Sequence, residues 1–128
     1  MSLLEIRGLC KTYNTGEAAL KGVDLTLKGQ EIVAVLGLSG SGKSTLLRCI
    51  NRLVEPDAGV VILEGTEITS LRQRALRRRR RQMGMIFQEF NLVERLTVLE
   101  NVLSGRLGSV SPWRAITRAF SKEDINKA

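Results

Sequence analysis

The residues best suited to chemistry form one short segment, residues 37–45, which reads GLSGSGKST. Its first eight positions fit the pattern G-x-x-x-x-G-K-[ST] in full. Glycines let the backbone curl so that successive N–H groups point toward one anion, and the lysine adds a mobile positive charge for the outer phosphates of a nucleotide. The hydroxyl that follows suits Mg²⁺. The segment therefore predicts a Walker A phosphate loop that binds a nucleoside triphosphate with Mg²⁺.

Each position of this loop is a candidate for nucleotide binding. Lys43 is also a candidate catalytic residue, because its charge reaches the outer phosphates, and Ser44 is a candidate Mg²⁺ ligand. The candidate nucleotide-binding residues are Gly37, Leu38, Ser39, Gly40, Ser41, Gly42, Lys43, Ser44 and Thr45.

Elements of the required kind are predicted on both sides of the loop. Residues 31–36 are a continuous run rich in apolar and β-branched residues, which predicts a strand covered on both faces. Residues 44–53 carry leucine and isoleucine at helical spacing, so a helix should follow the loop and offer its unpaired N–H groups and the positive end of its dipole. A glycine-rich turn without a ligand is the alternative, and the order strand, loop, helix argues against it.

The rest of the chain alternates between strand and helix patterns. Alternating apolar residues predict two strands at 3–9 and 20–28, joined through a turn at 14–16 and paired antiparallel. Thr97 and Glu100 form a capping box that predicts a helix to Leu107. Further strands are expected at 60–63 and, buried, at 83–88; further helices are expected over the arginine-rich residues 72–81, from Ser111-Pro112, and after a cap at 121–124.

The charge of the chain lies in one place. Twenty Lys and Arg against 13 Asp and Glu give a net charge of +7, and residues 72–81 hold seven arginines with no acid. This segment, 72–81, has three interpretations: a solvated helix face, a contact with anionic lipid headgroups or membrane subunits, or a nucleic-acid contact. Nucleic acid is the least favoured and is not expected as a partner, because interleaved aromatic residues and a recognition motif are missing.

Composition excludes several classes of site. The chain has no histidine, which removes Ser-His-Asp and Cys-His catalysis and histidine-based zinc sites. Two cysteines are too few for a zinc site or a disulfide framework; the usage suits a reducing cytosol, and Cys49 is predicted to be a core residue. No uncharged stretch is long enough to span a bilayer, and we expect no signal peptide.

Beyond the loop, the sequence resembles the nucleotide-binding subunit of an ABC transporter. The resemblance is carried by KTYNTGEAALKGVDLTLKGQEIVAVLGLSGSGKSTLLRCINRLVEPDAGVVILEG and then by MGMIFQEFNLVERLTVLENVLSGRLG. It implies that Tyr13 stands where the family has an aromatic residue that stacks on adenine, an interaction worth about 1–3 kcal/mol where tested. It also implies that Gln88 is the Q-loop glutamine, a catalytic and Mg²⁺-binding candidate. The alternatives are a strand-end tyrosine and a solvated loop glutamine.

The resemblance implies a fold class as well. We expect an α/β P-loop NTPase of the ABC ATPase type, with an antiparallel β subdomain and the start of a helical subdomain. Residues 1–95 would form the nucleotide-binding core with the antiparallel β subdomain, the phosphate loop and the Q-loop. Residues 96–128 would form the start of the helical subdomain, truncated.

One stretch of the sequence indicates which class of ABC transporter the chain resembles most. FQEFNLVERLTVLENVLSGRLG, followed by SPWRAITRAF, most resembles the ATPase of phosphonate importers. The resemblance implies ATP hydrolysis coupled to phosphonate uptake, with ATP and Mg²⁺ as cofactors. It implies transmembrane permease subunits and a second nucleotide-binding subunit as partners, and a peripheral place on the cytoplasmic face of the inner membrane. The alternatives are the ATPase of another importer of small polar solutes, such as amino acids, and, less favoured, an unrelated P-loop enzyme such as a kinase.

Three family features are missing from the printed sequence: an LSGGQ signature, a Walker B strand ending in Asp-Glu, and a switch histidine. Leu103-Ser104-Gly105 does not qualify as a signature, because Arg106 and Leu107 follow it. Leu38 also stands where the family often has Pro. We therefore expect the incomplete, N-terminal part of a transport ATPase, which does not turn over ATP by itself. The alternative is a non-catalytic fragment that only binds nucleotide. Apolar strands without neighbours should invite aggregation.

Overall fold

The computed structural model describes residues 2–88, 92–105, 107 and 125. The chain divides into two compact units, Met1–Leu76 and Arg77–Ala128. In chain order the elements are β1 (Ser2–Thr12), β2 (Ala18–Lys28), α1 (Lys43–Ile50), β3 (Ala58–Leu63), β4 (Thr66–Glu67), α2 (Gln73–Arg80) and α3 (Val98–Ser104).

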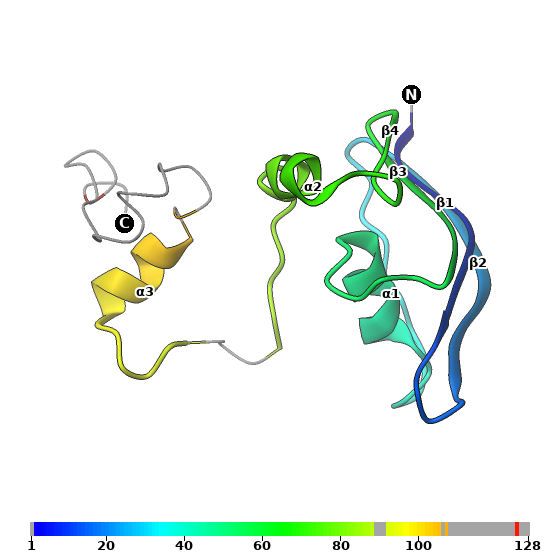
Figure 1. The fold of residues 1–128 in the computed structure, drawn as a ribbon, viewed down its shortest axis with the longest axis horizontal. Helices are drawn as coiled ribbons and strands as arrows, with labels where there is room; N and C mark the ends of the chain where they lie inside the picture. Colours follow the sequence, from blue (N-terminus) through cyan, green and yellow to red (C-terminus); the bar gives the residue numbers. More distant parts are fainter. Residues whose placement is uncertain (1, 89–91, 106, 108–124, 126–128) are drawn as a thin grey trace. The chain divides into compact units, whose positions relative to one another are not determined.

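The first unit is built on an antiparallel sheet in the order β2-β1-β3-β4 (Figure 1). β1 and β2 form the predicted hairpin: Leu9 pairs with Val23 and Thr12 with Ala18, and the turn lies at residues 14–16. β3 pairs antiparallel with the other side of β1. The strands predicted at 3–9, 20–28 and 60–63 and the antiparallel pairing of the first two are confirmed, and each of the three is longer than its sequence pattern suggested.

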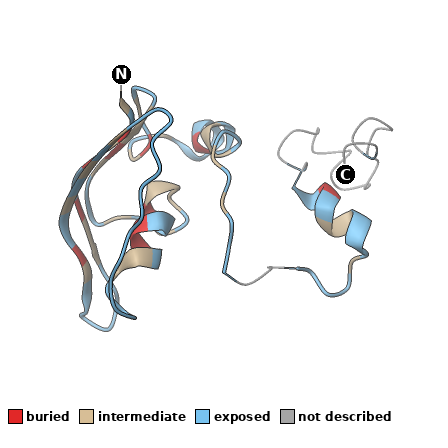
Figure 2. Ribbon diagram, turned by 180° about the vertical axis from the view of Figure 1, so that it is seen from behind, coloured by how far each residue is buried: buried red, intermediate tan, exposed pale blue. Residues whose placement is uncertain are grey.

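The core of this unit lies between the sheet and α1, which contacts β2 (Figure 2). Because side chains alternate across a strand, Leu4 and Ile6 of β1 both turn inward, and a register shift after Ile6 lets Leu9 do so as well. Cys49 is fully buried, which confirms its prediction as a core residue. The buried apolar side chains of this unit are Leu4, Ile6, Leu9, Leu20, Leu46, Cys49, Val61, Ile68 and Leu76.

The strand predicted before the phosphate loop is absent, and this prediction was wrong. Residues 31–36 form no ladder, and Ile32 and Leu36 are 99% and 89% exposed. The buried strand predicted at residues 83–88 is also absent, with Ile86 100% exposed. An apolar run becomes a strand only where a neighbour accepts and donates its backbone hydrogen bonds. Among the described residues, the single sheet has no strand that pairs with either run.

The observed helices lie where the sequence predicts them, but their ends differ from the predicted ends. α1 begins at Lys43 and ends at Ile50, three residues before the predicted end. Leu47 within the helix and Leu53 beyond it are both exposed. α2 is helical as predicted. The helix predicted to reach Leu107 ends at Ser104. The helix expected at Ser111-Pro112 and the cap at residues 121–124 lie outside the described residues.

The capping box at the start of α3 is confirmed. The Thr97 N–H donates to Glu100 Oε2 at 2.8 Å, and the Glu100 N–H donates to Thr97 Oγ1 at 3.3 Å. Each side chain thus satisfies a backbone donor that the helix itself leaves unpaired. In the described part of the chain, no helix has the length and apolar character needed to cross a membrane.

Candidate nucleotide-binding site

The phosphate loop turns on two glycines with left-handed backbone. Gly40 has φ 80° and Gly42 has φ 90°, a region that residues with a Cβ rarely adopt. At Gly42 a Cβ would also collide with the backbone carbonyl of Ala19 in β2. The loop therefore lies directly on the hairpin, and its end at α1 is fixed by backbone contact.

The ammonium of Lys43 folds back over its own loop. Its Nζ donates to the carbonyl oxygens of Gly37 at 2.8 Å and Leu38 at 2.7 Å, and to Ser41 Oγ at 3.4 Å. The Ser41 N–H in turn donates to Leu38 O at 3.2 Å. The sequence motif predicted a cationic side chain beside curled backbone, and the structure brings the two together.

Helix α1 opens toward the loop without a competing cap. Gly42 is its N-cap residue and supplies no side-chain hydrogen bond, and the first turn holds no acidic residue. The positive end of the helix dipole and its free N–H groups thus face the loop, an arrangement that favours an anion. Ser44 is exposed at this end, whereas Thr45 is 8% exposed.

Tyr13 lies beside the same end of α1. Its hydroxyl is 3.1 Å from Thr45 Oγ1, and its side chain remains partly open to solvent. Backbone bonds within the hairpin turn fix its position: the Tyr13 N–H donates to Glu17 O and its carbonyl accepts from Gly16. Tyr13 and the phosphate loop are 24 or more residues apart in sequence yet adjacent in the fold. Adenine stacking on Tyr13 stays a prediction.

Gln88 belongs to the second unit. Its side chain is exposed, and residues 83–87 before it form no strand. Its proposed contacts with Mg²⁺ and the attacking water therefore stay predictions.

The donor set suits a magnesium ion that travels with the nucleotide. Among the described residues, no group of three or more His, Cys, Asp or Glu could hold a metal. Mg²⁺ commonly binds proteins through one or two side chains and takes its other ligands from substrate phosphates and water. The exposed Ser44 hydroxyl beside Lys43 fits that pattern.

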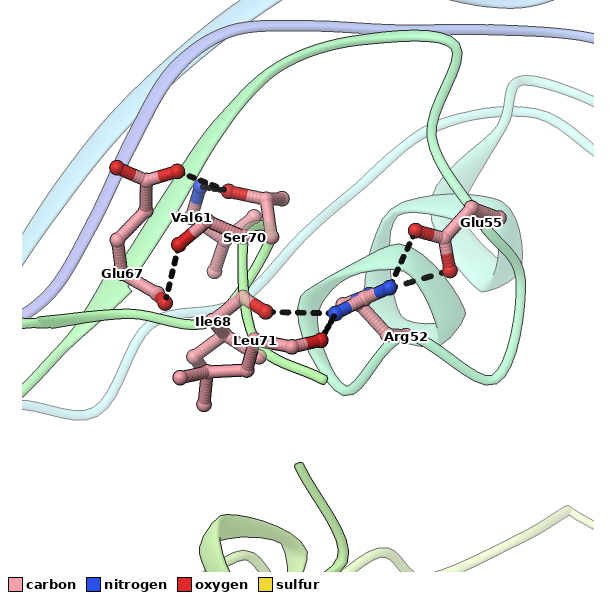
Figure 3. A network of polar contacts seen from close by, with 8 residues as sticks. Arg52, Glu55, Val61, Glu67, Ile68, Ser70 and Leu71 are labelled. Atoms are coloured by element: carbon pink, nitrogen blue, oxygen red, sulfur yellow. Dashed lines mark hydrogen bonds and ion pairs between the residues drawn. The ribbon is translucent and has the colours of Figure 1, made fainter. Parts of the chain in front are cut away.

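Arg52 helps to position α1, and the sequence alone did not predict this role. The Arg52 guanidinium, just beyond α1, donates to the carbonyls of Ile68 and Leu71, both at 2.8 Å, and pairs with Glu55 at 2.6 Å (Figure 3). Its side chain is 9% exposed. Arg52 therefore ties the end of the helix that carries the phosphate loop to the segment after β4. The only sequence signal was Glu55 three residues later, a spacing typical of a helical ion pair.

A second link fixes the strand end next to Tyr13. Asp57 accepts from Lys11 Nζ at 2.7 Å and from the Thr12 N–H at 2.6 Å. The hydrogen bond from Lys11, then that from Thr12, lowers the pKa of Asp57, and the same bond raises the pKa of Lys11. Burial raises the pKa of the Cys49 thiol. The Lys11–Asp57 pair holds the start of the hairpin turn.

A family model described as ABC transporter matches residues 20–128, which include the phosphate loop and α1. The chain belongs to the ABC transporter family. Among solved ABC cassettes, the dimeric structure of MJ0796, a bacterial ABC transporter cassette, matches 97% of this chain with 37% identity and a TM-score of 0.81. A post-hydrolysis MJ0796 dimer bound to ADP and phosphate matches with a TM-score of 0.80. The fold is that of an ABC cassette, and this family binds ATP and ADP.

The curated ABC relatives agree in subfamily. The phosphonates import ATP-binding protein PhnC 2 of Haloarcula marismortui is 60% identical over 126 residues, 98% of this chain and 46% of that protein. PhnC 1 of Ruegeria sp. strain TM1040 is 56% identical over 98% of this chain and 49% of its own length. The chain spans about half the length of the curated relatives it matches, and 53% of the MJ0796 cassette.

Proposed function

We propose that this chain is the nucleotide-binding, N-terminal part of the ATPase of an ABC importer, which couples ATP hydrolysis to phosphonate uptake. The observation that carries the proposal is the Lys43 ammonium held over a glycine loop at the open end of α1. Support for phosphonate comes from relatives named as phosphonate import proteins. Residues 1–95 serve as the core and residues 96–128 begin the helical subdomain.

Each candidate residue has one task in this proposal. Backbone N–H groups of the loop bind the phosphates. The Lys43 ammonium exchanges its hydrogen bonds with the loop carbonyls for hydrogen bonds with the outer phosphates. Ser44 would ligate Mg²⁺, which would supply positive charge to the phosphates. The Tyr13 ring stacks on adenine, and Gln88 reaches Mg²⁺ or the attacking water. Permease subunits at the cytoplasmic face of the inner membrane, and a second nucleotide-binding subunit, complete the importer.

Lys43→Ala tests the phosphate site. A hydrogen bond to a charged group is worth about 1.5–3 kcal/mol, so ATP affinity should fall roughly 10- to 150-fold in a calorimetric titration. Lys21→Ala, an exposed lysine of β2, is the matched control and should bind as the parent does. Phosphate release from Mg-ATP should stay at background in all three proteins. Equal ATP affinity in Lys43→Ala and the parent would reject the phosphate site. Phosphate release above background in the parent that Lys43→Ala abolishes would show that the chain does hydrolyse ATP.

Growth tests the transported solute. Disrupting the gene of the complete ATPase, of which this chain is proposed to be the N-terminal part, should prevent growth on a phosphonate as the sole phosphorus source, because the importer then loses its ATP hydrolysis. Growth on inorganic phosphate should not change. A strain that grows normally on phosphonate but fails to take up an amino acid would assign the ATPase to the other importer class.

A further inference from the structure

The arginines of α2 are sorted onto two faces. Residues spaced i, i+3, i+4 and i+7 share one side of a helix, and Arg74, Arg77, Arg78 and Arg81 have this spacing. Arg81 directly follows the helix, and all four side chains are exposed. The opposite side carries Leu76, which is 0% exposed. We call these four residues, Arg74, Arg77, Arg78 and Arg81, the arginine face.

The remaining arginines of the helix differ in burial. Arg79 and Arg80 stand next to Leu76 on the helix surface and are half-buried, and Arg79 donates to Gln82 Oε1 at 3.0 Å. Burial thus follows the helical period. The fully buried Leu76 shows that the side of α2 opposite the arginine face is the covered one.

The charge of this face is uncompensated. Within the part of the chain that the structure describes, none of its four arginines forms an ion pair, and residues 72–81 contain no acid. Like charges three and four residues apart repel and weaken a helix, although a position near the negative C-terminal end of the dipole offsets part of this cost. A polyanion that lies along the helix would relieve the repulsion.

We propose that the arginine face binds the anionic headgroups of a lipid bilayer. Guanidinium groups form paired hydrogen bonds with phosphate oxygens, and lipid headgroups present many phosphates in one plane. The face has no apolar side chain, so α2 binds at headgroup level and does not insert. The membrane as partner rests on the proposed function, since that places the chain beside its permease subunits.

Nucleic acid fits the face less well. Proteins that bind single strands combine basic residues with aromatic side chains that stack on bases, and residues 72–81 contain no aromatic residue. They contain no asparagine either, and their single glutamine, Gln73, lies outside the arginine spacing. The chemistry of the face is therefore limited to charge and phosphate.

Sedimentation with vesicles tests the proposal. The full chain should bind phosphatidylcholine vesicles that contain phosphatidylglycerol and should not bind pure phosphatidylcholine. Each basic residue near an anionic surface contributes roughly fivefold, so Arg77→Gln with Arg78→Gln should weaken binding roughly 20- to 30-fold at low salt. Binding of the parent should decrease as salt rises, because the contacts are screened.

A matched double variant separates the face from total charge. Lys21→Gln with Arg48→Gln removes the same two charges from exposed positions of β2 and α1, and it should retain most of the binding. Circular dichroism of both variants checks that each is folded. Equal loss in the two double variants, or binding indifferent to salt, overturns the arginine face as the membrane contact.

Two further measurements keep the outcomes distinct. Tighter binding to a duplex oligonucleotide than to anionic vesicles at the same salt would overturn the lipid assignment in favour of nucleic acid. ATP titration of Arg77→Gln with Arg78→Gln should match the parent, because the face is separate from the phosphate loop in sequence. Failure of ATP binding in the parent would reject the proposed function and leave the vesicle result standing.

Discussion

At the scale of single residues, the contact between Lys11 and Asp57 stabilises the strand end beside Tyr13. The carboxylate binds one ammonium and one backbone N–H, and both favour its charged form. A carboxyl whose pKa is lowered by folding contributes stability above its unfolded pKa, and this stability disappears as pH falls through the folded value.

Asp57→Asn should therefore lower stability at neutral pH and flatten its acid dependence. The parent should lose stability as pH falls below 3.8, the ordinary value for this carboxyl, and the variant should lose less over that window. Urea unfolding followed by circular dichroism at several pH values measures both. Glu17→Gln, at an exposed turn position, should keep the parental profile. Overlapping acid profiles of Asp57→Asn and the parent would count against the contact.

The candidate site divides clearly into what sequence could predict and what it could not. The loop residues were predictable, because phosphate binding demands certain residue types at fixed local spacing. Lys11 and Asp57 are 46 positions apart, and each looks like an ordinary surface charge in the sequence. No local pattern reveals that two distant carbonyls turn toward Arg52.

At the scale of elements, Arg52 connects α1 to the chain after β4. Its backbone has a left-handed φ of 53°, and its guanidinium spans two carbonyls and a carboxylate. A lysine ammonium is a point charge that cannot match this planar fork. The helix that positions Lys43 is thus held at both ends, by Gly42 on β2 and by Arg52.

Arg52→Lys should destabilise the chain although it preserves the charge. The loss should be about 1.5–3 kcal/mol, the usual contribution of hydrogen bonds from a charged group, in urea unfolding. Glu55→Gln removes only the ion pair, whose carboxylate is 60% exposed, and should cost less than about 1 kcal/mol. Similar losses in the two variants would show that the ion pair, and not the carbonyl contacts, stabilises this junction.

Element types were largely predictable and element partners were not. The hairpin followed from alternating residues around a turn, because both signals are local. Residues 31–36 had an equally strong strand pattern and form none. A sequence pattern reports what a segment prefers to bury, whereas a strand exists only when another strand supplies its ladder.

At the scale of the whole molecule, exposed apolar residues gather in residues 32–38, which lead into the phosphate loop. Ile32, Leu36 and Leu38 are 85–99% exposed, an unusual state for large apolar side chains in sequence proximity. The curated relatives are about twice as long as this chain. In the chain as printed, the segment should promote self-association.

Ile32→Lys with Leu36→Lys should therefore reduce aggregation without lowering the free energy of unfolding, because neither side chain is packed. Light scattering over time and urea unfolding measure the two effects. Leu92→Lys with Val98→Lys adds the same charge at exposed apolar positions of the second unit and is the control. If both double variants suppress scattering equally, added charge alone explains the result and the segment has no special role.

The contacts of Lys43 have a consequence for which anions the loop accepts. Two carbonyls and one hydroxyl already accept hydrogen bonds from the ammonium, so an incoming anion must replace these hydrogen bonds. An anion of low charge density should attract the ammonium too weakly to replace them, whereas an anion of high charge density should attract it strongly enough. Under the proposed function, the lysine would set a threshold of charge density that favours polyphosphates over anions of lower charge.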